Sequence, residues 1–182
     1  MATLKGAQGF VFEYGDVQPL FARSGHVAVR GRAIYLGDAD ALEVRVYSTS
    51  GRRERVMRAL LFDLSLSSGE VEEERRRLLS HDMPAPFREA IETLPSPATR
   101  PAYSGLLVDP AGHLWAIGTQ TGEATGPNAA QVFGPDGQWL GRVEIPEGFR
   151  MLEVGLDYVL GVRTDALGIE RVQLLSLVRR GK

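Results

Sequence analysis

Short runs in which apolar and polar side chains alternate dominate this chain of 182 residues. In the run LEVRVY, residues 42–47, apolar side chains at Leu42, Val44 and Val46 alternate with polar ones. Because successive side chains of a strand point to opposite faces, alternation of this kind places one set against a core and the other in solvent. The pattern therefore predicts an all-β fold. Strands are predicted at residues 9–14, 26–29, 33–36, 42–47, 55–61, 103–109, 114–118, 131–133, 139–145, 151–154, 158–162 and 169–177.

One stretch, residues 62–101, has the apolar spacing of helices instead of strands. Ser67 and Glu70 have the spacing of a capping box, which makes Ser67 the expected N-cap of a first helix. The charge run EEERRR at residues 72–77 is interpreted as a solvated helix face with internal ion pairs. A second short helix is predicted over Ala85–Leu94, with its apolar side chains on one face. This region is therefore expected to be a helical insertion between strand-rich regions.

Similar segments recur in this chain at intervals of a little over forty residues. Trp115 and Tyr158, which occupy similar sequence surroundings, are 43 positions apart, and Glu43 and Glu170 are 127 apart. The second interval is close to three periods of about 42 residues, and a period of this length with about four short strands is typical of a β-propeller blade. The interval from Tyr35 to Trp115 is 80 residues, and the helical insertion accounts for the excess.

The repeat predicts a single partial β-propeller domain of about three four-stranded antiparallel blades, with the helical insertion between the first and second blades. The N-terminal run is a candidate to complete the last blade, which shows too few strands. The predicted boundaries are 17–61 for blade one, 62–101 for the insertion, 102–144 for blade two and 149–180 for blade three, with 9–14 as its additional strand.

A family resemblance rests on six segments: RERVMR (53–58), AYSGLLVD (102–109), GHLW (112–115), VFGPDG (132–137), WLG (139–141) and GLDYVLGV (155–162). In these segments the chain resembles the C-terminal half of a bacterial family of six-bladed β-propellers, largely of unknown function. The similarity extends from about Val27 to Val178. It implies half of a six-bladed wheel and a location outside the cytoplasm. Met1–Gly9 nevertheless has no apolar segment of the kind found in a secretory signal, so the sequence leaves the location open.

Composition excludes several function classes. The formal net charge is −2, so there is no basic excess to bind a nucleic-acid backbone. The chain contains no cysteine, which excludes disulfides, thiolate nucleophiles and cysteine-ligated metal sites. No segment approaches the roughly 20 apolar residues of a membrane-spanning helix. No cofactor is predicted.

Two turns and two tryptophans are candidates for a functional role. The turns Asp109–Gly112 and Pro135–Gly137 have the residue types that β-turns favour, and a structural role is preferred over a calcium loop, which needs more oxygen ligands. Trp115 and Trp139 are predicted to pack between blades, with ligand stacking as the alternative. The small-residue stretch Gly122–Gly126 is interpreted as a loop.

Titratable residues show no spacing that indicates a site. The three histidines lack the paired spacing of metal ligands, and Glu43 and Glu170 occupy matching repeat positions that face solvent or a neighbouring blade. A cation at the centre of the wheel could take a ligand from a separate set of carboxylates. The candidate metal ligands are His26, His81 and His113 and, for that central cation, Glu13, Glu153 and Asp157.

The sequence favours a non-catalytic binding or scaffolding module of β-propeller type. The alternative is a metal-dependent hydrolase or lactonase with a site at the propeller centre. No catalytic, cofactor-binding or metal-ligating residue is assigned. Three blades leave open sheet faces and edges, so we expect self-association, such as a homodimer that completes a six-bladed wheel, or a protein partner that covers the open blades.

Overall fold

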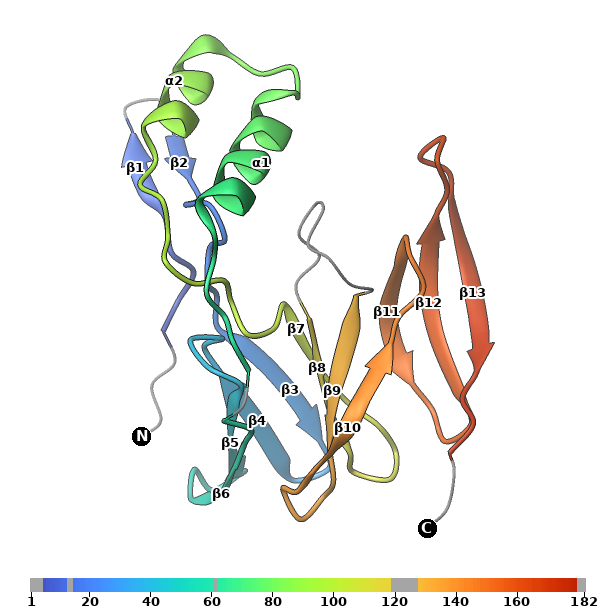
Figure 1. The fold of residues 1–182 in the computed structure, drawn as a ribbon. Coiled ribbons are helices and arrows are strands. Elements are labelled where there is room, and N and C mark those ends of the chain that lie inside the picture. The colour runs from blue at the N-terminus through green and yellow to red at the C-terminus, as the bar shows by residue number, and fades with distance from the viewer. Residues whose placement is uncertain (1–4, 13–14, 61, 119–127, 180–182) are drawn as a thin grey trace.

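The computed structural model describes residues 5–12, 15–60, 62–118 and 128–179, and shows an all-β fold of antiparallel sheets with two helices (Figure 1). The predicted all-β class and the predicted pair of helices are thus confirmed. The elements are β1 (Phe10–Phe12), β2 (Gly15–Val17), β3 (His26–Arg30), β4 (Ala33–Gly37), β5 (Glu43–Ser48), β6 (Arg53–Arg58), α1 (Ser68–Leu79), α2 (Ala85–Thr93), β7 (Gly105–Val108), β8 (Leu114–Ile117), β9 (Ala129–Phe133), β10 (Trp139–Glu144), β11 (Phe149–Val154), β12 (Tyr158–Thr164) and β13 (Glu170–Ser176).

Three of the sheets are simple meanders, in which each strand pairs with the next along the chain. Sheet one contains β3 to β6, sheet two contains β7 to β10, and sheet three contains β11 to β13. Within the described residues, sheet three has one strand fewer than the other two. The three sheets stand side by side in chain order (Figure 1).

The sequence repeat corresponds to strand position within these sheets. The similar segments 42–47, 131–133 and 169–175 coincide with β5, β9 and β13 to within two residues at either end, and each of these is the third strand of its sheet. Tyr35 and Trp115 lie in the second strands β4 and β8, and Tyr158 begins the second strand β12. The segments predicted to be equivalent therefore occupy equivalent places in the strand order.

The turn between the third and fourth strands is the same in sheets one and two. Residues 48–52 and 134–138 each close a hairpin in which the amide of the first residue donates to the carbonyl of the fifth. Gly51 and Gly137, the fourth residues of these turns, have φ of 81° and 92°. A side chain at this position would be strained, so the turn explains why both repeats carry glycine there.

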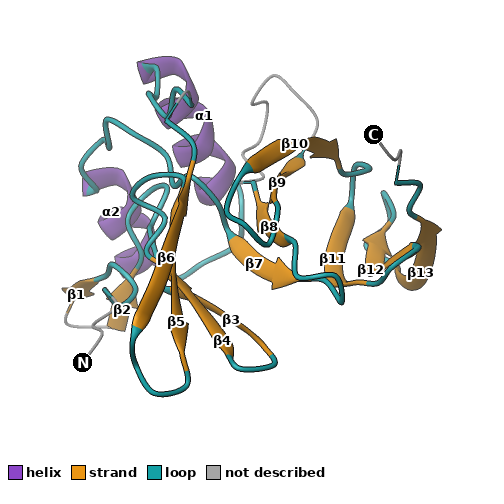
Figure 2. Cartoon of the chain, turned by 90° about the horizontal axis from the view of Figure 1, so that it is seen from below, coloured by secondary structure: helices purple, strands orange, loops and turns teal. Residues whose placement is uncertain are grey.

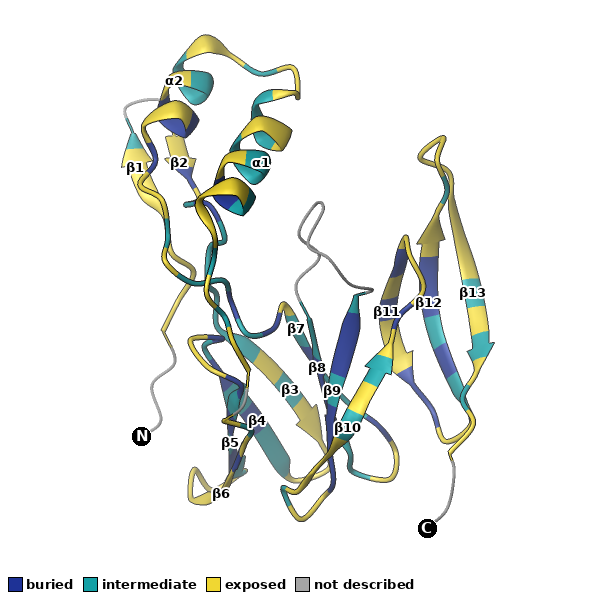
Figure 3. Ribbon diagram, viewed as in Figure 1, coloured by how far each residue is buried: buried dark blue, intermediate teal, exposed yellow. Residues whose placement is uncertain are grey.

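Sheet two is buried on both faces, whereas sheets one and three are each buried on one. One face of sheet two, which carries Leu114 and Phe133, packs against Val44 and Val46 of sheet one. Its other face, which carries Trp115 and Val132, packs against Phe149 and other residues of sheet three. Figure 3 shows the resulting contrast between the dark, buried strands β8 and β9 and the largely exposed β13. The core of this region is thus two apolar layers on either side of the middle sheet.

The first strands of the three sheets are neighbours in space. β3 contacts β7, and β7 contacts β11, so the sheets approach one another along their first strands. Figure 2 shows the strands of sheet one fanning out, with β7 beside them and β11 to β13 beyond.

The helices form a third apolar cluster together with the N-terminal hairpin. β1 pairs with β2, and Phe12 and Val17 pack with Val71 of α1 and Ile91 of α2. This corrects the expectation that residues 9–14 complete sheet three: within the described residues, 10–12 form a hairpin with 15–17 instead. The physical reason is that the folded helices offer an apolar surface, including Val71 and Ile91, on which this run packs.

The predicted capping box of α1 is present. The Ser67 hydroxyl accepts from the amide of Glu70 at 3.3 Å, and a Glu70 carboxylate oxygen accepts from the Ser67 amide at 3.0 Å. Hydrogen bonds lower the pKa of Glu70 to about 2. The bond from the Ser67 amide has the largest effect, and those from Arg100 and the Ser67 hydroxyl add to it. The start of the helix is therefore fixed by local chemistry.

Replacing Ser67 by alanine is expected to lower the free energy of unfolding by about 1 kcal/mol, because one helix-terminal amide loses its acceptor. Ser68, the next residue, is exposed and has no capping role, so Ser68→Ala is the matched control and should leave stability nearly unchanged. Urea unfolding followed by circular dichroism measures both. Equal effects of the two substitutions would contradict the capping role.

The charge run of α1 is only partly a solvated face. Glu73 and Glu74 form the expected i,i+3 ion pairs with Arg76 and Arg77. Arg75 differs, because its side chain is only 12% exposed and its guanidinium donates to backbone carbonyls at the end of α2, among them that of Leu94 at 2.9 Å. This arginine therefore caps the second helix and joins the two helices.

Candidate interaction faces and an interior polar network

Asp109 is the one fully buried charged residue among those the structure describes. It begins the turn between β7 and β8, where its Oδ1 accepts from the amides of Ala111 and His113, each at 2.9 Å. Its Oδ2 accepts from the indole Nε1 of Trp115 at 3.1 Å. The predicted turn role of Asp109 is therefore correct, but the carboxylate also serves as a buried acceptor for its own sheet.

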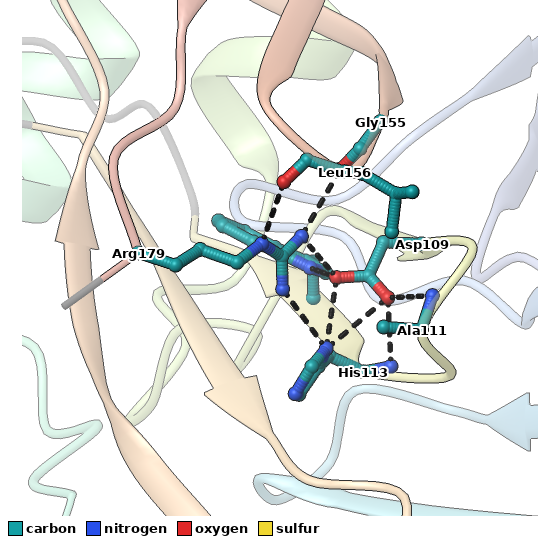
Figure 4. A network of polar contacts seen from close by, with 7 residues as sticks. Asp109, Ala111, His113, Gly155, Leu156 and Arg179 are labelled. Atoms are coloured by element: carbon teal, nitrogen blue, oxygen red, sulfur yellow. Dashed lines mark hydrogen bonds and ion pairs between the residues drawn. The ribbon is translucent and has the colours of Figure 1, made fainter. Parts of the chain in front are cut away.

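Arg179 reaches the same carboxylate from the segment that follows β13. Its Nη2 donates to Asp109 Oδ2 at 2.7 Å and to the carbonyl of Gly155 at 3.0 Å, and its Nε donates to the carbonyl of Leu156 at 2.9 Å (Figure 4). Asp109 belongs to sheet two, while Gly155 and Leu156 connect the strands of sheet three. The arginine thus ties the two sheets together through a fixed set of hydrogen bonds.

His113 completes the network. Its Nδ1 lies 3.0 Å from Asp109 Oδ2 and 3.0 Å from Arg179 Nη1. A neutral or charged imidazole that carries its proton on Nδ1 donates to the carboxylate, and this nitrogen then has no lone pair left for the guanidinium. With the proton on Nδ1, His113 donates to Asp109, and the carboxylate of Asp109 is the side-chain acceptor of Arg179.

Five N–H groups point at the Asp109 carboxylate, and they decide its ionisation. Burial alone has the largest influence and would raise the pKa of Asp109. The hydrogen bonds from Arg179, from the backbone of His113 and from Trp115 together outweigh burial, so the pKa lies below the usual 3.8. The carboxylate is therefore charged near neutral pH, which suits it to holding structure and not to exchanging a proton there.

The turn at Asp165, on the surface, repeats the hydrogen bonds that Asp109 makes with its turn amides and with an arginine. Its Oδ1 accepts from the amides of Leu167 and Ile169, each at 3.0 Å, and its Oδ2 pairs with Arg171 at 2.9 Å. The side chain of Asp165 is 31% exposed, whereas that of Asp109 is 0% exposed. The two sites share turn chemistry and differ in burial, which makes them a natural comparison.

Sheet one has an open face that carries apolar side chains. Val27, Val29 and Val56 are 56%, 61% and 39% exposed, and strand register places the half-buried Ile34 and Leu36 on the same face, opposite Val29 and Val27. We call these five residues the open face of sheet one. It is the side of the sheet turned away from sheet two, because Tyr35 and Val46 on the other side form the shared core.

Sheet three has a matching open face on the far side of the stack. Leu152, Val172 and Leu174 are 44%, 74% and 64% exposed. Leu160 pairs with Leu174, and Tyr158 lies on the same side two residues earlier. We call these five residues the open face of sheet three. Scattered exposed apolar residues are ordinary, but a set gathered on one sheet face indicates a surface that binds another surface.

A groove of about 520 Å³ separates the helical layer from the sheets, with Phe21, Phe87 and Tyr103 among its lining residues. The Tyr103 hydroxyl donates to the carbonyl of Glu43 at 3.0 Å and accepts from the amide of Ala39 at 3.3 Å. Burial is the main cause that raises the pKa of Tyr103 to about 12. Its hydroxyl is thus committed to joining sheets one and two.

The histidines and tryptophans weighed from the sequence lie in separate surroundings. The ring of His26 lies tilted against that of Tyr103, with the ring centroids 5.4 Å apart, and burial lowers the pKa of His26. His81 follows α1, where its Nδ1 lies 3.0 Å from the carbonyl of Arg77. Trp115 packs between sheets two and three as predicted. Trp139 does not, because it lies on the outermost strand of sheet two and is 44% exposed.

The carboxylates weighed from the sequence do not converge in the described part of the chain. Glu153 accepts from the Tyr158 hydroxyl at 2.6 Å, Glu170 pairs with Arg150 at 3.9 Å, and Asp157 is exposed. Glu43 is half-buried on β5. Among the described residues no three His, Asp or Glu side chains are grouped to hold a metal ion. Glu13 and the predicted loop Gly122–Gly126 lie outside the described residues.

No protein-family model matches this chain, and the comparison with curated proteins finds no significant match. No helix in the described ranges has the length and apolarity needed to cross a membrane.

Proposed function

We propose that this chain is a non-catalytic binding or scaffolding module whose three meander sheets are blades of β-propeller type. Three observations support the blade interpretation. The strands follow the same order in each sheet, the first strands are neighbours, and successive sheets pack face to face. A propeller is built from four-stranded sheets arranged in this way around an axis.

The observation that carries the binding role is the pair of open faces at the two ends of the stack. In a stack of sheets each apolar face is covered by its neighbour, and only the end faces need a partner from elsewhere. Val29 and Leu174, at opposite ends, are 61% and 64% exposed. Binding of a protein surface at these faces removes apolar area from water, which is the main source of association free energy.

Site-specific labelling tests this proposal. Because the chain contains no cysteine, each introduced cysteine is its only thiol. Single-cysteine variants Val29→Cys and Leu174→Cys are exposed to a membrane-permeant maleimide, both in producing cells and as dilute purified protein. We expect labelling at least about tenfold slower in cells than in the purified chain, because a bound partner covers the thiol.

The control is Ser50→Cys, which changes one atom at an exposed position in the β5–β6 turn. This thiol should react at the same rate in both settings. If Val29→Cys and Leu174→Cys are labelled as fast as Ser50→Cys in both settings, the end faces bind no partner and the proposal is wrong.

A further inference from the structure

Successive sheets of this chain meet through one repeated pair of faces. Tyr35, on the second strand of sheet one, lies on the face that packs on sheet two. Trp115, at the equivalent place in sheet two, lies on the face that packs on sheet three. We call the face that carries this aromatic residue the leading face of each sheet, and the opposite one its trailing face.

Each open face is one half of this repeated contact. Tyr158 is the equivalent aromatic residue of sheet three, and its neighbour Val159 points the other way into the core with sheet two. The open face of sheet three is therefore a leading face. The open face of sheet one is a trailing face, because Tyr35 lies on its other side. Both contacts inside the chain join a leading face to a trailing face, and one unused face of each kind remains.

We propose that the open face of sheet three binds the open face of sheet one in a second copy of the chain. This inference rests on the proposed function and names the partner. With a two-fold axis the same contact forms twice. Sheet three of each copy packs through its leading face on the trailing face of sheet one in the other copy. Two copies then close a ring of six sheets with every sheet face covered, and closed symmetric dimers are the commonest form of self-association.

The charges at the two open faces are complementary. Around the apolar residues of sheet one, strand register places three arginines, Arg45, Arg53 and Arg58, and one carboxylate, Glu43. The charge of Arg45 is partly neutralised by Asp38, whose Oδ2 lies 3.2 Å from Arg45 Nη2.

The corresponding rim of sheet three has the opposite balance. It carries two carboxylates, Glu153 and Glu170, and one arginine, Arg150. The trailing face is thus net basic and the leading face net acidic, which favours pairing of unlike faces over pairing of like ones.

Sedimentation velocity over a wide concentration range measures the assembly. We expect a discrete dimer and no larger species, and we expect Val29→Lys or Leu174→Lys to weaken dimerisation at least about 100-fold, because each places an unpaired charge in an apolar contact. Both positions are exposed in the single chain, so unfolding by urea should be unaffected in dilute solution. Ser50→Lys, at the exposed turn, should dimerise as the unchanged chain does.

Crosslinking tests which faces meet. β3 and β11 are the first strands of sheets one and three, so Val29→Cys of one copy should lie near Leu152→Cys of the other. A short bis-maleimide should crosslink a mixture of the two single-cysteine variants and should fail on either variant alone, because like positions lie on opposite sides of the two-fold axis.

A stable monomer at all concentrations, an open series of larger species, or crosslinks within a single variant would each overturn the closed two-copy ring. These outcomes are separate from failure of the proposed function. If the purified chain stays monomeric while Val29→Cys and Leu174→Cys remain protected in cells, a different protein covers the end faces and only the second copy is excluded.

Discussion

Asp109→Ala is expected to lower the free energy of unfolding by about 3–5 kcal/mol, one of the two largest effects we predict in this chain. The carboxylate is 0% exposed and pairs with the guanidinium of Arg179. Removing the carboxylate takes the buried acceptor from the guanidinium, which is itself 33% exposed and so stays partly solvated. The substitution also leaves the Trp115 indole N–H and two turn amides without their acceptor, and buried donors without partners are costly.

The matched control is Asp165→Ala. It removes an aspartate that makes the same two turn hydrogen bonds and the same kind of arginine contact, at a surface position. Exposed ion pairs and solvated turn groups contribute little, so a loss of about 1 kcal/mol or less is expected. Urea unfolding in dilute solution, followed by circular dichroism, gives both values. Similar losses for the two variants would show that the buried network does not hold sheets two and three together.

The same carboxylate predicts a loss of stability in acid. Because the pKa of Asp109 is lower in the folded chain than its usual 3.8, its contribution to stability is fully present above about pH 4 and is lost as the pH falls through the folded pKa. Asp109→Asn removes the titrating group but keeps the size of the side chain. The difference in unfolding free energy between the unchanged chain and Asp109→Asn should therefore shrink below about pH 4, and a pH-independent difference would contradict the assignment.

The sequence predicted features that depend on near neighbours. Strands appear where apolar and polar side chains alternate, and α1 begins behind Ser67 because the capping residues are three positions apart. The turns with Gly51 and Gly137 follow the same logic, since only a few adjacent residues decide the backbone conformation. The repeat extended this local signal to strand order, because similar segments take equivalent places in their sheets.

The N-terminal run shows where such reasoning fails. The apolar residues of 9–14 suit any sheet edge or apolar surface, and nothing within the run tells which one it meets. The structure pairs Phe10–Phe12 with Gly15–Val17 against the helices. The competing surface, which includes Val71 and Ile91, is more than fifty residues away in the sequence, so the outcome depends on tertiary packing and not on the pattern of the run.

The polar network was missed for the same reason. Asp109 was correctly assigned to a turn, because its hydrogen bonds to Ala111 and His113 are local. Its burial and its arginine were not predictable, since Arg179 is 70 residues away and nothing in the sequence around it points to a buried partner. An available signal was the spacing of Asp109, His113 and Trp115, which puts three hydrogen-bonding side chains at the start of one hairpin.

Trp115→Ala is expected to cost about 3–5 kcal/mol of unfolding free energy, the other large effect. The ring is 2% exposed and lies in the apolar layer between sheets two and three, and deleting a buried aromatic side chain removes its contacts and leaves a cavity. Trp139→Ala is the control. That ring is 44% exposed, and its Nε1 donates to the Gln131 side chain at 3.1 Å, so a loss of about 1 kcal/mol or less is expected.

A double-mutant cycle separates packing from the polar network. Trp115 and Asp109 share a hydrogen bond, so the double variant Asp109→Ala, Trp115→Ala should lose less stability than the two single losses added together. Trp139 makes no contact with Asp109 among those the structure shows, so Asp109→Ala and Trp139→Ala should add within about 0.5 kcal/mol. Additive losses in both cycles would mean that the indole fills space between the sheets without supporting the carboxylate. A loss of 1 kcal/mol or less for Trp115→Ala would contradict the packing of sheet three on sheet two, on which the stack and both open faces depend.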